Sequence, residues 1–385
     1  MTTACETLSP HLLPAQELPT LRQTRFEDYP QIASLETSHE LITLAEDDWR
    51  RVWTDNPLWP RLKEHWPIGW VLEDNRGKIV GSLGNVPFHY TFQGKSLISA
   101  CGRGWVVAPE YRGVALWLMD EYFNQDGADL FVNTTVNALA AGIVGSLSAR
   151  VPAGDWQAAA FWVTSYHGFA RTALRMKDIP MTGLLAPAAA LGLRLKDLVS
   201  SKALPPANQA FAIAEASGFD PRFDVFWKQL VEQNPNKLLA VRDVATLNWH
   251  FSIPMRHEKV WIITASQHGI LRAYCTLKRE DQPAGLQGLT RMRLVDFQTL
   301  EPEADLLPSL LRPALHRCRV EGIHVLEHMG CDLPKMAAFD RFAPHRRKLQ
   351  CWKFYSKATD PAIDVQLASA QAWDPSTYDG DATID

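Results

Sequence analysis

The sequence predicts an α/β protein with two tandem domains, each built from a mixed, mostly antiparallel sheet flanked by helices. Two observations carry this prediction. The spacing of apolar residues changes repeatedly between a helical and a strand period, and the order of segments in the first half returns in the second half. Residues 181–219, rich in Ala, Leu and Pro, lie between the halves and have the composition of a linker.

The first predicted domain spans residues 19–180 and follows a leader, residues 1–18, that we expect to be flexible. Helices are predicted where apolar residues recur three and four positions apart, and strands where short apolar segments lie between turn residues. In chain order, the predicted segments are strand 21–24, helices 26–44 and 47–53, strands 69–73, 78–86 and 97–107, helix 113–124, strand 130–134, helix 137–149 and a strand region at 161–170.

The three central strands of this domain have the turn chemistry of successive hairpins. Asn75-Arg76-Gly77 follows the first strand, and Gln93-Gly94 precedes the third. Gly102 and Gly104 lie inside the third strand, where glycine indicates a bulge or a close approach to the backbone. Pro109 ends this strand.

The second predicted domain, residues 220–357, repeats this order more loosely and precedes an acidic tail, residues 358–385, that we expect to be mobile. An apolar stripe from Leu307 to Cys318 predicts its clearest helix. In chain order, the predicted segments are helix 223–231, strands 259–265, 270–277 and 291–300, helix 307–318, strand 323–328, helix 333–339 and strand 349–355.

Composition limits the classes of function. The formal net charge is −4, which gives no general attraction to nucleic acid or to an anionic membrane. No apolar stretch reaches the ~20 residues that a membrane-spanning helix needs. The six cysteines are scattered without a CxxC pair, and no His/Cys spacing matches a closed zinc site. We therefore expect a cytoplasmic protein with free thiols, no metal, no nucleic-acid partner and no membrane span.

The segment after the third central strand has the properties of an anion site. It reads Val-Ala-Pro-Glu-Tyr-Arg-Gly from Val107 to Gly113, and an amphipathic helix is predicted to begin at once. The free N–H groups at a helix start, together with the helix dipole, attract anions. Gly113 allows a phosphate to approach the backbone, and Arg112 adds a charged, forked donor. We therefore predict that a diphosphate binds at the start of this helix.

This run resembles the pyrophosphate-binding motif of the GNAT acetyltransferase superfamily, and the order of segments from Leu21 to Ala170 is similar to the GNAT fold. The resemblance implies that acetyl-CoA or another acyl-CoA is a substrate. It implies that one strand bonds pantetheine through its backbone and that the motif holds the diphosphate. The next strand would then lie beside the acyl carbonyl and the acceptor amine. The helix after that strand carries an asparagine in many members of the family. The residues assigned in this way are Trp105, Val106, Val107, Arg112, Gly113, Val114, Ala115, Asn133 and Asn137.

The sequence also departs from the family pattern. The motif usually runs Arg-Gly-x-Gly-x-Gly, but Ala115 and Trp117 replace its second and third glycines, and Val144 stands where many members carry a tyrosine acid. Two functions therefore stay open: an N-acyltransferase acting on a small amine such as an amino sugar or a cell-surface precursor, and a non-catalytic GNAT-like ligand-binding or scaffold protein. A third, an aminoacyl-tRNA-dependent transferase of the FemAB type, expects a basic RNA channel that the net charge of −4 disfavours.

Acyl transfer to an amine needs a base that deprotonates the ammonium and an acid that protonates the leaving thiolate. By residue type, Glu73, His89 and Glu110 are the candidate bases, of which Glu110 is the least attractive because it lies beside the phosphates, and Tyr166 is the candidate acid. The second domain has no matching loop, because the acidic run at 301–305 would repel a diphosphate. We therefore expect only the first domain to hold acyl-CoA.

Overall fold

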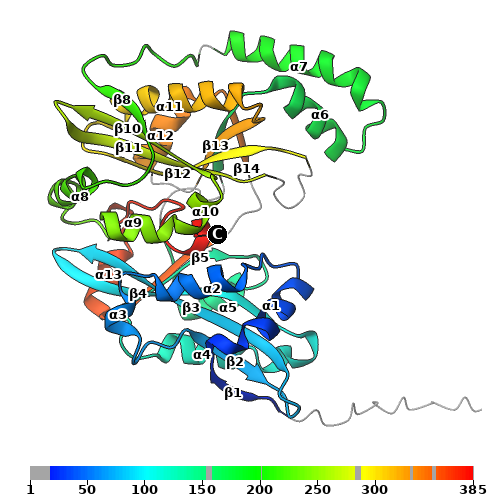
Figure 1. The fold of residues 1–385 in the computed structure, drawn as a ribbon, viewed down its shortest axis with the longest axis vertical. Helices are drawn as coiled ribbons and strands as arrows, with labels where there is room; N and C mark the ends of the chain where they lie inside the picture. Colours follow the sequence, from blue (N-terminus) through cyan, green and yellow to red (C-terminus); the bar gives the residue numbers. More distant parts are fainter. Residues whose placement is uncertain are drawn as a thin grey trace, which may run out of the picture. The chain divides into compact units, whose positions relative to one another are not determined.

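The computed structural model of the chain describes residues 18–152, 158–200, 202–281, 288–329, 333–348 and 353–384. Within these ranges the strands form two mixed sheets, accompanied by helices (Figure 1). The predicted α/β class with two sheets is confirmed. The predicted flexible leader, apart from Leu18, lies outside the described residues.

The first sheet is mostly antiparallel. In spatial order its described strands are β1 (Thr20–Gln23), β2 (Gly69–Glu73), β3 (Ile79–Phe92), β4 (Lys95–Val107), β5 (Leu130–Val136), β15 (Lys353–Ala358) and β6 (Ala149–Arg150), and β9 (Leu239–Ala240) pairs with β3. The parallel pair is β4 with β5, which is in register at Ser99 and Ala100.

The second sheet has the same mixed character. In spatial order its described strands are β14 (His345–Lys348), β7 (Ala158–Val163), β13 (Val325–Met329), β12 (Arg291–Thr299), β11 (Ile270–Arg279), β10 (Val260–Gln267) and β8 (Ala212–Ala216). Here β12 and β13 run parallel, and the other described pairs run antiparallel.

Helices connect these strands, and η marks short 3-10 helices. Before residue 200 they are η1 (Phe26–Asp28), α1 (Tyr29–Ser38), α2 (Glu46–Thr54), α3 (Trp59–Leu62), η2 (Pro109–Val114), α4 (Leu116–Asn124), α5 (Ala141–Leu147), α6 (Tyr166–Met176) and α7 (Thr182–Val199). After it they are α8 (Arg222–Gln233), α9 (Val244–His250), α10 (Ser252–Arg256), α11 (Glu303–Val320), α12 (Leu333–Phe342), α13 (Pro361–Leu367), η3 (Ala370–Ala372) and η4 (Asp381–Thr383). Over the described part of the chain, none of these helices combines the length and apolarity needed to cross a membrane.

The chain divides into two compact units that do not follow the sequence order. The first unit comprises Met1–Glu46, Pro67–Asn85 and Gly102–Asn124. The second comprises Asp47–Trp66, Val86–Cys101 and Gln125–Asp385. The strands β3 and β4 therefore each begin in one unit and end in the other.

The core of the first unit follows the predicted helical stripes. Ile32 and Leu35 of α1 are buried, as are Leu118, Met119 and Tyr122 of α4. The helix α4 contacts β2, so its apolar face covers a strand whose residues are themselves buried. Burying such side chains stabilises the unit by about 1.5–3 kcal/mol each.

The core of the second sheet follows the apolar stripe predicted between residues 307 and 318. Figure 1 shows α11 along the strands β10 to β13. The stripe residues on α11 are fully buried against β10, β11 and β12: they include Leu306, Leu307, Leu310, Leu311 and Ala314.

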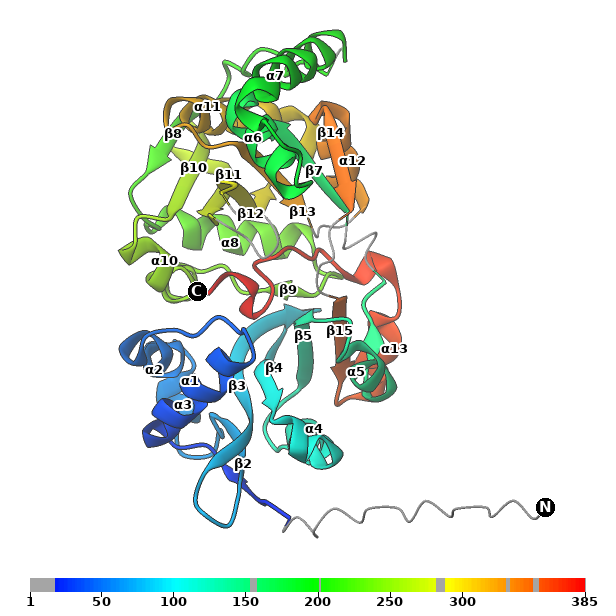
Figure 2. The same ribbon diagram turned by 90° about the vertical axis from the view of Figure 1, so that its right-hand side faces the viewer.

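Two strands join the sheet of the other half, which differs from the predicted domain boundary at residue 180. The strand β7 pairs with β13 and β14 in the second sheet, whereas β15 pairs with β5 in the first (Figure 2). Moreover, β7 ends at Val163, and the expected strand region 161–170 continues as α6, whose buried Ala170 and Thr172 face inward. The apolar pattern identifies a strand but not its partner, because partners are chosen by tertiary packing.

The expected linker and tail are also more ordered than predicted. Residues 181–219 contain the 18-residue helix α7, which packs beside α6, and the strand β8, which pairs with β10 (Figure 2). The segment after residue 358 forms α13, and its residues from Trp373 to Ile384 are almost all buried. Both segments gain apolar or polar partners from distant parts of the second unit, and composition cannot report such partners.

Candidate functional site

The predicted phosphate-binding residues form an exposed turn in the first unit. The strand β4 ends at Val107, η2 covers Pro109–Val114, and α4 begins at Leu116. The predicted helix 113–124 therefore starts as a 3-10 turn, whose last bond runs from the Ala115 N–H to the Arg112 carbonyl at 3.2 Å. Arg112 and Gly113 are exposed, and a Cβ placed on Gly113 would meet no atom within 4 Å. The backbone of this turn is thus open to an anion.

The three predicted pantetheine-binding residues are the last three of β4. Val106 and Val107 are buried by their side chains, which fixes the strand end. Trp105 is half-buried, and its indole N–H is shielded from solvent without a hydrogen-bond partner among the described residues. A shielded donor without an acceptor costs about 1–3 kcal/mol, so it marks a position where a ligand acceptor would be stabilised.

A carboxylate that the sequence analysis did not select lies against the preceding residue of β4. Gly104 has a left-handed backbone with φ +64°, and a Cβ there would lie 2.5 Å from Oε1 of Glu36 on α1. The glycine inside this strand had predicted a bulge or a close approach, and the close approach is that of Glu36. The sequence signal therefore existed at Gly104, but it did not name the partner.

The environment of Glu36 raises the pKa of its carboxyl to about 7. Burial is the main cause, and the positive charge of Arg103 opposes it. No hydrogen bond or ion pair joins the Glu36 carboxylate to another described side chain. A shielded carboxyl without a partner is the kind of group whose proton affinity moves into the neutral range.

The candidate base Glu73 lies at the end of β2 and is held in an ion pair. Arg22 donates from Nε to Glu73 Oε2 at 2.7 Å and from Nη1 to Asp28 Oδ2 at 2.7 Å. One guanidinium therefore ties β1 to β2 and to the turn before α1. This arrangement gives Glu73 a structural role.

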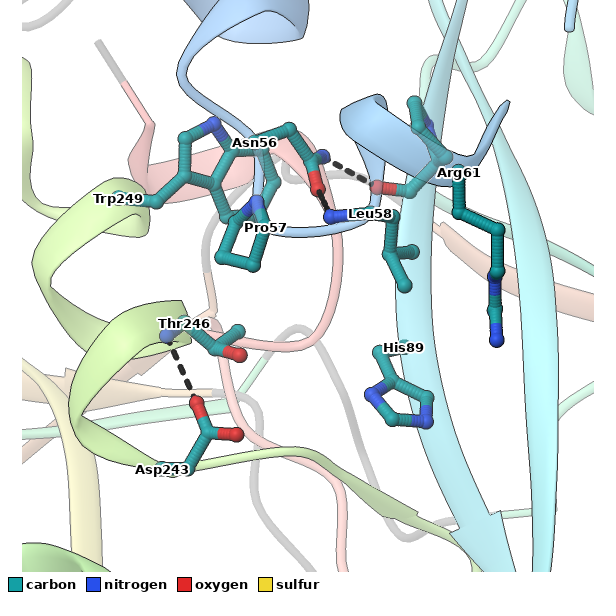
Figure 3. A pocket seen from close by; sticks show the side chains of 9 residues that line it. Asn56, Pro57, Leu58, Arg61, His89, Asp243, Thr246 and Trp249 are labelled. Atoms are coloured by element: carbon teal, nitrogen blue, oxygen red, sulfur yellow. Dashed lines mark hydrogen bonds between the residues drawn. The ribbon is translucent and has the colours of Figure 1, made fainter. Parts of the chain in front are cut away.

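The candidate base His89 lines a pocket of about 290 Å³ in the second unit (Figure 3). Its walls are Asn56, Pro57, Leu58, Arg61, Pro87, His89, Asp243, Thr246 and Trp249. Asn56 shapes one wall, because its Nδ2 donates to the Pro87 carbonyl at 2.8 Å and its Oδ1 accepts from the Leu58 N–H at 2.9 Å. Asp243 shapes the opposite side by capping α9 through the Thr246 N–H at 2.8 Å.

His89 lies on the part of β3 that lines this pocket. Burial lowers its pKa, which the nearby Arg61 also lowers and Asp243 raises. Its Nε2 lies 2.7 Å from Oγ of Ser96, so the hydroxyl fixes the ring. Ser96 is the second residue of β4, whereas Trp105–Val107 are its last three. The pocket can hold a small ligand that presents both a positive and a negative group to Asp243 and Arg61.

The other predicted residues belong to the second unit. Tyr166 begins α6 and donates from its hydroxyl to Asp197 Oδ2 at 2.8 Å, and burial together with this carboxylate raises its pKa to about 12. Asn133 is buried on β5. Asn137 caps the turn before α5, since its Oδ1 accepts from the N–H groups of Leu139 and Ala140. Tyr166 and Asn137 therefore have structural partners.

The C-terminal segment brings a further carboxylate to β5. Asp381 accepts hydrogen bonds from the hydroxyls of Thr134 and Thr135, each at 3.2 Å. The adjacent Gly380 has φ +112°, and a Cβ there would lie 2.5 Å from Oγ1 of Thr134. The acidic composition of the tail had pointed to solvent, so this contact was missed.

The described residues include side chains that can bind metals and three of the six cysteines. No three His, Cys, Asp or Glu side chains in the described part of the chain gather as ligands of a metal would. Cys101, Cys275 and Cys318 are buried and form no disulfide. The three other cysteines lie outside the described residues.

Comparison with known proteins identifies the fold. The sequence matches no protein-family model and no curated protein. Among solved structures, it is similar to a GCN5-related N-acetyltransferase from Anabaena variabilis, at 11% identity and a TM-score of 0.51, covering 89% of this chain and 73% of that one. Yeast (Saccharomyces cerevisiae) N-myristoyltransferase with bound myristoyl-CoA has 13% identity and a TM-score of 0.53, covering 91% and 81%. An Enterococcus faecalis protein of unknown function, described as a probable N-acyltransferase, has 12% identity and a TM-score of 0.51, covering 88% and 72%. The chain therefore has the GNAT fold, and two tandem GNAT-like domains fit its two sheets.

Proposed function

We propose that this protein is an N-acyltransferase that transfers an acetyl or related acyl group from acyl-CoA to a small amine. An amino sugar or a cell-surface precursor is the acceptor class we favour. The observation that carries the proposal is the exposed turn at Arg112 and Gly113, which offers open backbone and a guanidinium directly after β4. The likeness to acyltransferase structures, one of them with bound myristoyl-CoA, supports the same chemistry.

The residues of the first unit fit an acyl-CoA. Backbone groups of Trp105–Val107 would bond pantetheine, and the unpartnered indole N–H of Trp105 offers a further donor. The turn from Arg112 to Ala115 would hold the diphosphate. Asn133 and Asn137 are proposed to lie on the acceptor side. The thioester supplies an activated acyl carbonyl, and the protein must orient the amine and remove its proton.

Charge reversal at Arg112 tests the donor site. We expect Arg112→Glu to weaken the binding of CoA and acetyl-CoA by about 10- to 100-fold in calorimetric titration, because it removes a forked donor and adds a repelling charge. Arg76→Glu in the exposed turn between β2 and β3 is the matched control and should leave affinity unchanged. Thiol release from acetyl-CoA with a panel of amines then measures transfer. Failure of the wild-type chain to bind CoA at millimolar concentration would reject the proposal.

A non-catalytic ligand-binding protein is the second candidate function. The pocket around His89 favours it, because its walls are formed without any residue of the phosphate turn. A small zwitterion that protects the chain against thermal unfolding, in the absence of any acyl-CoA turnover, would support this alternative over the enzyme.

A further inference from the structure

The contact between α1 and β4 places an unusual carboxylate beside the proposed acyl-CoA strand. Oε1 of Glu36 lies so close to Gly104 that any side chain at position 104 would collide with it. Gly104 directly precedes Trp105–Val107, the backbone run proposed to bond pantetheine. Both residues belong to the first unit, so this neighbourhood does not depend on the placement of the second.

The carboxylate of Glu36 is largely shielded from solvent, but no described side chain binds it. It has neither a hydrogen bond nor an ion pair with a described side chain. Among the described residues, the charged and titratable groups that face it are Arg103 on β4 and Tyr29 on its own helix. Tyr29 is engaged elsewhere, since its hydroxyl donates to the Leu44 carbonyl at 2.7 Å.

Of the other acids and bases considered, Glu110 lies in η2 beside the proposed diphosphate, His89 lies in the second unit, where it lines a separate pocket, and the rest are committed to structural contacts. Glu73 accepts from Arg22, and Tyr166 donates to Asp197. Asp381 accepts from two threonine hydroxyls. A residue that must take a proton from a substrate needs a free lone pair in reach of it. Of these groups, Glu36 meets that need.

We propose that Glu36 is the general base that deprotonates the acceptor ammonium, a role that rests on the proposed acyltransferase function. The carboxylate takes one proton from the ammonium, and the freed nitrogen lone pair forms the C–N bond at the acyl carbon. The C–S bond breaks, its electron pair leaves on sulfur, and the second nitrogen proton neutralises the thiolate. The products are an amide, a thiol and a protonated Glu36, which releases its proton to solvent.

The test compares Glu36→Gln with Glu40→Gln, an exposed neighbour along the chain that serves as the matched control. We expect Glu36→Gln to lower kcat/KM by about 10²- to 10⁴-fold while leaving CoA affinity within about twofold in calorimetry. In the wild type, kcat/KM should rise with pH through about 7, as expected for a base with the pKa of Glu36. This rise should be absent in Glu36→Gln. Glu36→Asp, which keeps a carboxylate, should retain the pH-dependent rise with an intermediate rate.

A second readout does not depend on turnover. Infrared difference titration of the free protein should show carboxyl absorption that is lost as the pH passes about 7, from Glu36 and from Asp379 in the second unit, and Glu36→Gln should lose the share that Glu36 contributes while keeping that of Asp379. Near-wild-type turnover by Glu36→Gln would overturn the proposal. So would a loss of CoA affinity parallel to the loss of rate, or a Glu36→Asp variant without the pH-dependent rise. A wild-type chain that binds CoA but acylates no amine would instead defeat the proposed function itself.

Discussion

Replacing Glu36 by glutamine should stabilise the protein in mild alkali and leave its stability unchanged in acid. The fold raises the pKa of this carboxyl from 4.5 to about 7, chiefly through burial. Because the folded pKa lies above the unfolded value, the group contributes stability below about pH 4.5 that is lost as the pH rises through about 7. At 1.36 kcal/mol per unit of pKa, the difference between the folded and unfolded pKa corresponds to about 3 kcal/mol. Partial exposure of the side chain reduces the expected effect to about 1–2 kcal/mol.

Urea unfolding, followed by tryptophan fluorescence, measures this effect. The difference in unfolding free energy between Glu36→Gln and the wild type should be near zero at about pH 4.5 and should grow to about 1–2 kcal/mol in favour of the variant at about pH 8. Glutamine has nearly the same shape, so the packing on Gly104 is kept. Glu40→Gln should show no such pH dependence. A difference that stays constant with pH, or a variant less stable at pH 8, would refute the reasoning, because it would mean that a partner stabilises the ionised carboxylate.

Two further stability predictions follow from the same structure. Gly104→Ala places a side chain on a left-handed backbone at φ +64° and against Glu36, so thermal unfolding should show a loss of about 1–3 kcal/mol; an unchanged midpoint would contradict the close approach. Asp296→Asn removes the buried carboxylate that accepts from Nε and Nη2 of Arg242 at 3.0 and 3.1 Å, so the free energy of unfolding in urea should fall by about 3–5 kcal/mol. A loss below about 1 kcal/mol there would show that Asp379 alone satisfies this arginine.

Local patterns predicted the elements that surround the phosphate turn. The strands β2, β3 and β4 follow apolar segments bounded by turn residues, and α4 follows an apolar stripe that ends near Asn124. These signals are local, since each depends on neighbours a few positions away. The exposed turn at Arg112 and Gly113 was predictable for the same reason: strand, turn and helix start follow one another along the chain.

Features that depend on distant partners could not be predicted from the sequence. The strand β7 pairs with β13, and its residue Phe161 is opposite Glu327. Nothing in the apolar run of β7 distinguishes this partner from one in the first sheet. The same limit applies to Glu36, which in sequence is one acidic residue on a helix. Its burial and its raised pKa arise only when α1 packs on β4 at Gly104.

The C-terminal segment shows most directly why contacts between distant residues could not be predicted from the sequence. Its acidic residues predict a solvated tail, because an unpaired carboxylate is costly to bury. In the fold, Asp379 lies 3.3 Å from Nη2 of Arg242, a buried cation 137 residues away, and Asp374 lies 2.9 Å from Nζ of Lys335. Pairing alone does not explain the burial of Asp379, since burial raises its pKa to about 7 despite Arg242. A raised pKa favours the protonated carboxyl, and the neutral form costs less to bury than the charged form. Acidic composition therefore fails to predict exposure where the fold pairs an acid with a cation, as Lys335 pairs with Asp374, or raises its pKa, as it does for Asp379.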